Sequence, residues 1–243
     1  MCSIDIEDVF NIICNFEPDT IAAVDSFGAE ALASLAYDTT NEVSLPIYRL
    51  HCFLALFLSP RTKDQQTAQA MKNLRSLPGG VSYITLCNLP EDELATVIKP
   101  AGFAKTKAKN LKKCIKTFID EYNCDIPKTY AELISLPGVG PKIALLVLQC
   151  AWNDCQGIAV DTHVHRVSNR VGFVDNTSSA EKTRIGLERV FPKPKWKLVN
   201  LCLVRFGQTV CLPKTPKCRD CPVGQHCPSF KVEEPAKKSC RRS

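Results

Sequence analysis

Lys142 is the one charged side chain between Glu132 and Asp154, and its position could make it a nucleophile. It follows the turn LPGVGP, and Pro141 suits the first position of a helix, so we expect Lys142 in that helix's first turn. There the positive end of the helix dipole and apolar surroundings would both favour the neutral amine, which attacks electrophilic carbon. A lysine that simply reaches solvent along its stem is the alternative interpretation.

Asp161 is the carboxylate that could assist such a lysine. It lies in the stretch VDTHVHRV, far enough beyond Lys142 for one helix and a return loop. As a structural residue, Asp161 would be the N-cap of the following helix. As a functional residue, it could activate the lysine or stabilise positive charge on a sugar ring, and the two roles are compatible.

Four cysteines have a spacing typical of a metal site. In the pattern C-x6-C-x2-C-x5-C they are Cys211, Cys218, Cys221 and Cys227. Zinc in a four-cysteine site and a [4Fe–4S] cluster are both chemically reasonable, and the spacing alone favours iron–sulfur only weakly. Lys214 and Lys217 lie between the first two cysteines, where a compact metal site could hold them against DNA.

The glycine-containing turn is a candidate phosphate site. A short helix should end near Leu136, and Gly138 and Gly140 permit a tight turn before the next helix begins. The turn amides and the N-terminus of the second helix would then point outward together. The region of about 129–152 therefore resembles a helix–hairpin–helix motif, which grips a DNA backbone without reading its sequence. A helical corner without a ligand is the alternative.

The remaining sequence predicts the scaffold that positions these residues. Almost every stretch has helical periodicity and none shows convincing strand alternation, so the predicted fold class is all-α. Residues 108–122 place apolar side chains on one helical face. Thr129 with Glu132 forms a capping-box pattern, and a second such pattern begins at Ser178.

Charge and composition favour a polyanionic partner. The 243 residues are 45% hydrophobic and carry a net charge of +6, which suits one large domain or two small ones. The strip from Lys99 to Lys116 holds seven lysines and no acidic residue, a repulsion that a phosphate backbone would relieve. No apolar run approaches membrane-spanning length, so we expect no membrane association.

LPGVGPK, VDTHVHRV and the cysteine pattern, in this order, resemble the endonuclease III family of DNA glycosylase/AP lyases. The resemblance extends from about Pro46 to Cys227. The segment LSPRTKDQ, which starts at Leu58, is most similar to the eukaryotic branch of the family.

The resemblance implies a two-domain helix–hairpin–helix DNA glycosylase fold. A six-helix barrel would occupy about residues 44–154. Residues 1–43 and 155–243 would form a helical iron–sulfur domain, with the cluster loop at 211–227.

The same resemblance implies roles for individual residues. Lys142 would be the nucleophile, Asp161 the catalytic carboxylate, and the four cysteines the ligands of a [4Fe–4S] cluster. The implied DNA contacts are Leu136, Gly138, Val139, Gly140, Arg61, Phe103, Lys214 and Lys217. Arg61 departs from the family, which has glutamine at that position to fill the gap left by a flipped base, so the opposite-base preference is in doubt. For Phe103, burial in the core is the alternative.

The implied activity is removal of oxidised pyrimidines of the thymine glycol type from duplex DNA, followed by cleavage 3′ to the abasic site through β-elimination. We expect a monomer. Acidic residues among the first ten argue against secretory and mitochondrial leaders, and the basic tail (Lys237, Lys238, Arg241 and Arg242) favours the nucleus.

Three other functions compete with this one. An adenine glycosylase of the same family would lack the lysine nucleophile and would carry a further C-terminal domain. A non-catalytic iron–sulfur DNA-binding module would need Lys142 or Asp161 displaced from the cleft. A zinc-stabilised helical adaptor would be colourless, whereas an iron–sulfur protein is brown.

Overall fold

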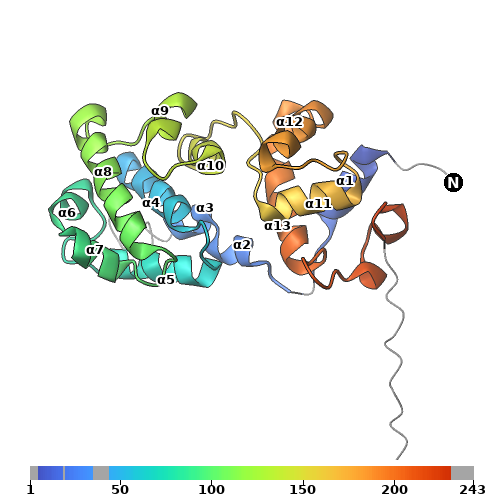
Figure 1. Cartoon of the computed structure of the whole chain (residues 1–243), viewed down its shortest axis with the longest axis horizontal. Helices are drawn as coiled ribbons and strands as arrows, with labels where there is room; N and C mark the ends of the chain where they lie inside the picture. The colour runs from blue at the N-terminus through green and yellow to red at the C-terminus, as the bar shows by residue number, and fades with distance from the viewer. Residues whose placement is uncertain (1–4, 19, 35–43, 231–243) are drawn as a thin grey trace, which may run out of the picture.

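The computed structural model describes residues 5–18, 20–34 and 44–230, and every regular element within those ranges is a helix (Figure 1). This confirms the predicted all-α fold class. The α-helices are α1 (Ile6–Asn15), α2 (Ala23–Phe27), α3 (Ala29–Ser34), α4 (Leu45–Leu58), α5 (Asp64–Arg75), α6 (Tyr83–Asn88), α7 (Glu91–Val97), α8 (Ala104–Tyr122), α9 (Tyr130–Ser135), α10 (Pro141–Ala151), α11 (Thr162–Val171), α12 (Ala180–Val190) and α13 (Trp196–Thr209). The 3-10 helices are η1 (Lys193–Lys195), η2 (Cys218–Asp220) and η3 (Gly224–His226). None of the described helices is long and apolar enough to cross a membrane.

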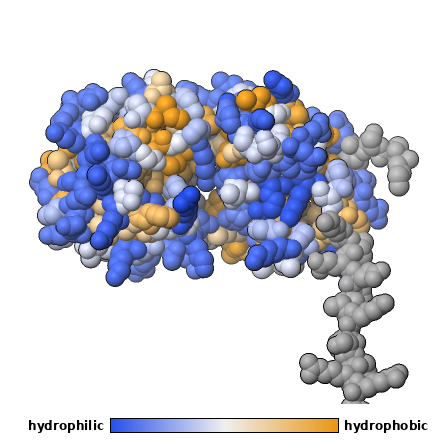
Figure 2. All heavy atoms as spheres, viewed as in Figure 1, coloured by the Kyte–Doolittle hydropathy of each residue, from blue (hydrophilic) through white to orange (hydrophobic). Residues whose placement is uncertain are grey.

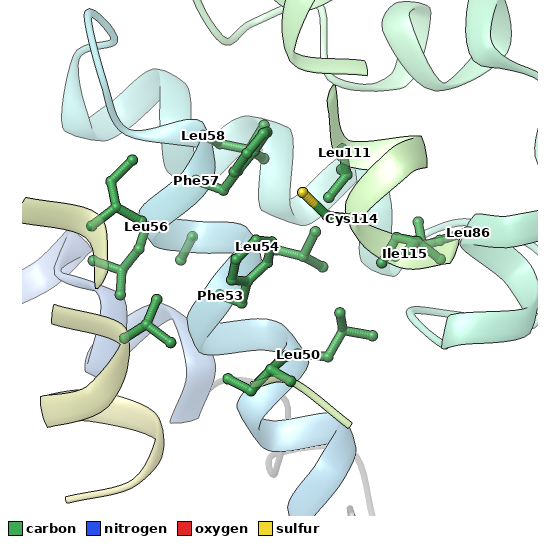
Figure 3. Packing of buried hydrophobic residues seen from close by; sticks show 14 of the residues in the cluster. Leu50, Phe53, Leu54, Leu56, Phe57, Leu58, Leu86, Leu111, Cys114 and Ile115 are labelled. Carbon is green, nitrogen blue, oxygen red and sulfur yellow. The ribbon is translucent and has the colours of Figure 1, made fainter. Parts of the chain in front are cut away.

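Helix α4 is the centre of the first hydrophobic core (Figure 3). All of its residues from Leu50 to Leu58 are buried, which explains the apolar run in the sequence. The Phe53 ring stacks on Phe57 at 5.5 Å and meets Phe118 of α8 edge-on at 5.0 Å. Each such burial contributes about 1.5–3 kcal/mol, so this core fixes α4, α8 and α10 relative to one another.

A second core joins α1, from the start of the chain, to α11, α12 and α13. The Phe10 ring of α1 lies 4.7 Å from Phe191 and 6.3 Å from Phe173, so the first helix is built into this core. Figure 1 shows the two groups of helices side by side, with α2 between them. Hydrophilic residues cover much of the outer surface of both groups in the face shown in Figure 2.

Polar contacts join the two cores through α2 and α5. Gln208 of α13 donates to the Asp64 carboxylate at 3.1 Å and accepts from the Val24 amide at 2.9 Å. Leu32 of α3 packs in the first core, although the sequence assigned residues 1–43 to the other domain. The limits given for the two domains stay a prediction, and the place of Leu32 differs from it. The basic tail lies outside the described residues.

The helix starts test two predicted capping boxes. Thr129 accepts from the Glu132 amide, and the Glu132 carboxylate accepts from the Thr129 amide, as predicted. The pattern at Ser178 is wrong by one residue, because Ser179 caps α12 and accepts from the Lys182 amide at 3.2 Å. The extended backbone of Ser179 places its hydroxyl over the first turn of the helix, as an N-cap requires.

Candidate active site and nucleic-acid surface

The turn between α9 and α10 is anchored by its apolar residues. The side chains of Leu136 and Val139 are buried in the first core. These two predicted DNA contacts can therefore act only through their backbone, and the Val139 amide is already bonded to the Leu136 carbonyl at 3.2 Å. Pro141 begins α10, and Lys142 follows in its first turn, as predicted.

The two glycines of the turn differ in what surrounds them. Gly138 has a φ of +87°, and a Cβ there would lie 3.1 Å from the Asn110 side chain and 3.2 Å from the Phe57 ring. Gly140 has an ordinary φ of −104°, and a Cβ there would meet nothing within 4 Å. The fold thus explains Gly138, whereas Gly140 leaves open space beside the N-terminus of α10.

Lys142 and Asp161 lie together, although they belong to helices of different cores. The Asp161 Oδ2 atom is 3.8 Å from the Lys142 Nζ atom. Its Oδ1 atom accepts from the amides of His163 and Val164, both at 2.8 Å, which confirms Asp161 as the N-cap of α11. The expected apolar shielding of the lysine is not seen, because its side chain is 40% exposed while that of Asp161 is 14% exposed. At this separation the two groups form an ion pair, and a closer approach or one bridging water would let them exchange a proton.

Helix α11 connects this pair to the cysteine-rich segment. Arg166 donates to the carbonyls of Gly207 at 2.8 Å and Cys211 at 3.0 Å. One turn further, Arg170 donates to the Leu212 carbonyl at 2.7 Å and contacts the Cys211 Sγ atom at 3.5 Å. Sequence analysis missed both arginines, although their spacing of four residues on an amphipathic helix could have suggested a shared face.

The four predicted metal ligands surround one cavity of about 320 Å³. The cysteines are Cys211, Cys218, Cys221 and Cys227, and Phe230 and Arg170 also line the cavity. Burial, reinforced by the other three cysteines, raises the pKa of the Cys221 thiol to about 11. Among the described residues, no three potential ligands converge tightly enough to hold a single metal ion. Four cysteines around one cavity form a donor set that suits a metal centre.

Exposed cations lie beside this cavity. Lys214 and Lys217 of the cysteine-rich segment are both exposed to solvent, as is Arg219. They are therefore available to a polyanion, as the sequence predicted for the two lysines.

The lysine strip is less available than its sequence suggested. The exposed members are Lys99, Lys105, Lys109, Lys113 and Lys116. Lys107 is buried, and Lys112 donates to the carbonyls of Leu86 and Leu89 at 3.0 and 2.7 Å, beside the end of α6. These two of the seven lysines are therefore less available to a phosphate backbone, because each donates to carbonyls of neighbouring segments.

Arg61 and Phe103 meet on the surface, although they are far apart in the sequence. The Arg61 Cζ atom lies 5.4 Å from the centre of the Phe103 ring. Both residues have a left-handed backbone, with φ of 54° and 60°. The Phe103 side chain is 60% exposed, so the alternative of a core phenylalanine is wrong.

Comparisons with known proteins point in one direction. Residues 54–193 match the HhH-GPD superfamily of base excision DNA repair proteins. The chain is 44% identical over 197 residues to a chloroplastic endonuclease III homolog of Arabidopsis thaliana, a match that covers 79% of this chain and 51% of the relative. The chain therefore spans about half the length of that relative. It is 39% identical over 222 residues to the endonuclease III homolog of Encephalitozoon cuniculi, covering 87% of this chain and 89% of the relative.

A solved structure of a trapped endonuclease III–DNA covalent intermediate, an estranged-adenine complex, is also similar. It has a TM-score of 0.71 and 30% sequence identity, and the match covers 83% of this chain and 93% of that one.

Proposed function

Since the chain belongs to the endonuclease III family, within the HhH-GPD superfamily of base excision DNA repair proteins, we propose that it is a DNA glycosylase and AP lyase. Its proposed substrates are oxidised pyrimidines of the thymine glycol type in duplex DNA. The observation that carries the proposal is the pairing of Lys142 with Asp161 at 3.8 Å. The solved relative was trapped as a covalent intermediate with DNA, which supports a nucleophilic mechanism.

The lysine supplies the nucleophile in the proposed reaction. Lys142 gives a proton to Asp161, and its free amine attacks the C1′ atom of the deoxyribose. A carbon–nitrogen bond forms while the bond from C1′ to the damaged base breaks, and the base leaves with its bonding electrons. Asp161 passes its proton to the departing base, and the restored carboxylate stabilises the positive charge of the covalent intermediate. Its position is fixed by the two amides of α11 that bind its other oxygen.

Strand cleavage follows from the covalent intermediate. The sugar opens to a Schiff base between Lys142 and C1′, which makes the C2′ hydrogen acidic. Loss of this proton expels the 3′ phosphate by β-elimination, and water then releases the lysine. The same amine therefore serves both the glycosylase and the lyase step.

Three surfaces would hold the DNA. The N-terminus of α10 and the open space at Gly140 suit a backbone phosphate. Lys214 and Lys217 are exposed cations that would neutralise further phosphates. Arg61 and Phe103 would enter the stack where the damaged base is flipped out, a step that costs a few kcal/mol. The guanidinium can hydrogen-bond the unpaired base, although its choice among opposite bases would differ from that of a glutamine.

The cysteine-rich segment fits a [4Fe–4S] cluster. Cys211, Cys218, Cys221 and Cys227 would be its ligands, because they surround one cavity and the thiolates would otherwise repel one another. Arg170 would hold the Cys211 sulfur, and η2 and η3 carry the following ligands. When bound, the cluster would keep this segment and its lysines in one shape. The chemistry at the sugar belongs to Lys142 and Asp161.

The absorption of the purified protein tests the cofactor. A brown protein with a broad visible band, and a loss of this band together with DNA affinity in Cys218→Ser, is the expected result. A colourless protein with tightly bound zinc would contradict the cluster and favour the helical adaptor.

We further propose that the protein acts in the nucleus as a monomer.

Product analysis tests the activity. A duplex with one thymine glycol and a label at the 5′ end of the damaged strand is incubated with the protein, and half of each sample is then heated in alkali. We expect cleavage before alkali, with the product of β-elimination. Cleavage only after alkali would leave a glycosylase without lyase activity. Tight binding without cleavage in either half would favour the non-catalytic DNA-binding module.

A further inference from the structure

Lys107 is the buried lysine of α8, with only 8% of its surface exposed. Its ammonium donates to the Leu58 carbonyl at 2.6 Å, the Pro60 carbonyl at 2.9 Å and the Thr62 hydroxyl at 2.9 Å. These three neutral oxygens use all three donors of the ammonium. Burying a charge is unfavourable unless it is fully hydrogen-bonded, so the site is built around this one group.

All three acceptors belong to one loop, which joins α4 to α5 and presents Arg61. Leu58 ends α4, where a carbonyl lacks a partner within the helix. Pro60 and Thr62 are the two neighbours of Arg61, whose left-handed backbone is unusual for a residue with a side chain. Lys107 therefore binds the Pro60 carbonyl on one side of the left-handed Arg61 and the Thr62 hydroxyl on the other.

The same cluster also reaches the segment that presents Phe103. The Thr62 hydroxyl that accepts from Lys107 also accepts from the Gly102 amide at 3.0 Å. The two segments touch so closely that a Cβ on Gly102 would lie 2.5 Å from the Arg61 carbonyl oxygen. Phe103 itself is left-handed, and α8 begins directly after it. One ammonium thus links both loops that carry the exposed arginine and phenylalanine.

We propose that Lys107 is a positioning residue that holds Arg61 and Phe103 together for insertion into a duplex with a flipped nucleotide. This inference rests on the proposed function, because it assumes that these two side chains enter DNA. Burial lowers the pKa of Lys107 to about 8, so near neutral pH the ammonium still supplies its three hydrogen bonds. Free of this tether, the left-handed Arg61 would relax, and the pair would separate.

Lys112 offers a matched control on the same helix. It also donates to neighbouring backbone carbonyls, those of Leu86, Cys87 and Leu89. Those acceptors lie at the end of α6 rather than in the loops of Arg61 and Phe103. A methionine at either position removes a comparable set of hydrogen bonds, but only one of the two variants loosens the proposed inserting pair.

The experiment uses two duplexes of one sequence, intact or with a tetrahydrofuran abasic analogue opposite 2-aminopurine. Affinity for each duplex, 2-aminopurine fluorescence and thermal unfolding are measured for wild type, Lys107→Met and Lys112→Met. Wild type should prefer the abasic duplex and raise the fluorescence. In Lys107→Met, the ratio of affinity for the abasic duplex to affinity for the intact duplex should fall about tenfold, and most of the fluorescence rise should be lost. Its affinity for the intact duplex should stay within about twofold of wild type.

Lys112→Met should lose thermal stability yet keep both signals. Full preference and full fluorescence in Lys107→Met would overturn the tether. If that variant does not fold, Thr62→Val removes the link to Gly102, and it should lose part of the preference; an unchanged preference would again overturn the inference. Arg61→Ala separates the hypothesis that Lys107 tethers the pair from the hypothesis that the pair enters DNA. If neither it nor Phe103→Ala alters the signals, insertion itself is wrong, and with it this part of the proposed function.

Discussion

The two carboxylate oxygens of Asp161 face different partners. Oδ1 caps α11 through two backbone amides, and Oδ2 lies 3.8 Å from the Lys142 Nζ atom. The capping bonds fix the aspartate, and α10 fixes the lysine, so the pair depends on how the two cores meet. A structural and a chemical role thus reside in a single side chain.

These two roles of Asp161 can be separated by substitution. Asp161→Asn keeps a capping oxygen but removes the negative charge, so the fold should remain while turnover falls at least about 100-fold. Asp161→Ala removes the cap as well and should cost about 1 kcal/mol of unfolding free energy in addition. Single-turnover excision of thymine glycol and chemical denaturation measure the two effects. Near-normal turnover in Asp161→Asn would exclude the carboxylate from the reaction.

The hairpin glycines provide a matched pair of substitutions. Gly138→Ala should destabilise the protein by about 1–2 kcal/mol, because a left-handed residue with a Cβ is strained and crowded by Phe57. Gly140→Ala should leave stability unchanged, since its Cβ meets nothing within 4 Å. If a phosphate approaches Gly140, the alanine there should nevertheless weaken binding to duplex DNA about tenfold. Normal affinity in a well-folded Gly140→Ala would remove this glycine from the interface.

The exposed lysines of the cysteine-rich segment should act through charge alone. Lys214→Ala and Lys217→Ala should each weaken binding to all duplex sequences, and should each reduce the slope of log affinity against log salt by about 1. Lys72, an exposed lysine on α5, is the control, and its alanine variant should keep the wild-type slope. Unchanged slopes in the first two variants would exclude this segment from the DNA interface.

Much of the site could be predicted because its signals are local. The start of α10 follows from Pro141 after a glycine turn, and the cap of α11 follows from an aspartate ahead of an amphipathic run. These features depend on a few neighbouring residues. The distance between Lys142 and Asp161 does not, because it is set by the packing of two cores.

The predictions from sequence were wrong where contacts between distant parts of the chain determine how buried a residue is. Lys107 resembles its exposed neighbours in sequence, and only the loop after α4 shows why it is buried. Arg166 and Arg170 bind carbonyls that lie 41 and 42 positions away in the sequence, so their spacing on α11 indicates a shared face but not what that face contacts. The shielding expected for Lys142 was also wrong, since an apolar helix does not cover the end of its own first-turn side chain.

A buried histidine should make stability depend on pH. Burial, reinforced by the charge of Arg75, lowers the pKa of His51 from its usual 6.5 to about 4. His51 is 4% exposed, so the folded chain binds no proton there between these values, whereas the unfolded chain does. The free energy of unfolding should therefore fall as pH falls from 6.5 towards 4.

Between about pH 7.5 and about pH 5, His51→Leu should remove about 2 kcal/mol of this pH dependence. Chemical denaturation of both proteins at about pH 7.5 and about pH 5 measures the difference. The remaining histidines are present in both proteins and cancel in the comparison. Equal losses of stability on acidification would contradict the assignment to His51.

Borohydride trapping on DNA with an abasic site tests the central claim, that Lys142 attacks the sugar. Reduction of a Schiff base links protein and DNA permanently, so wild type should give a covalent complex. Lys182→Ala, which removes a lysine from the first turn of α12, should trap equally well. Lys142→Ala should bind the DNA but give no covalent complex. A complex formed as readily by Lys142→Ala would contradict the account.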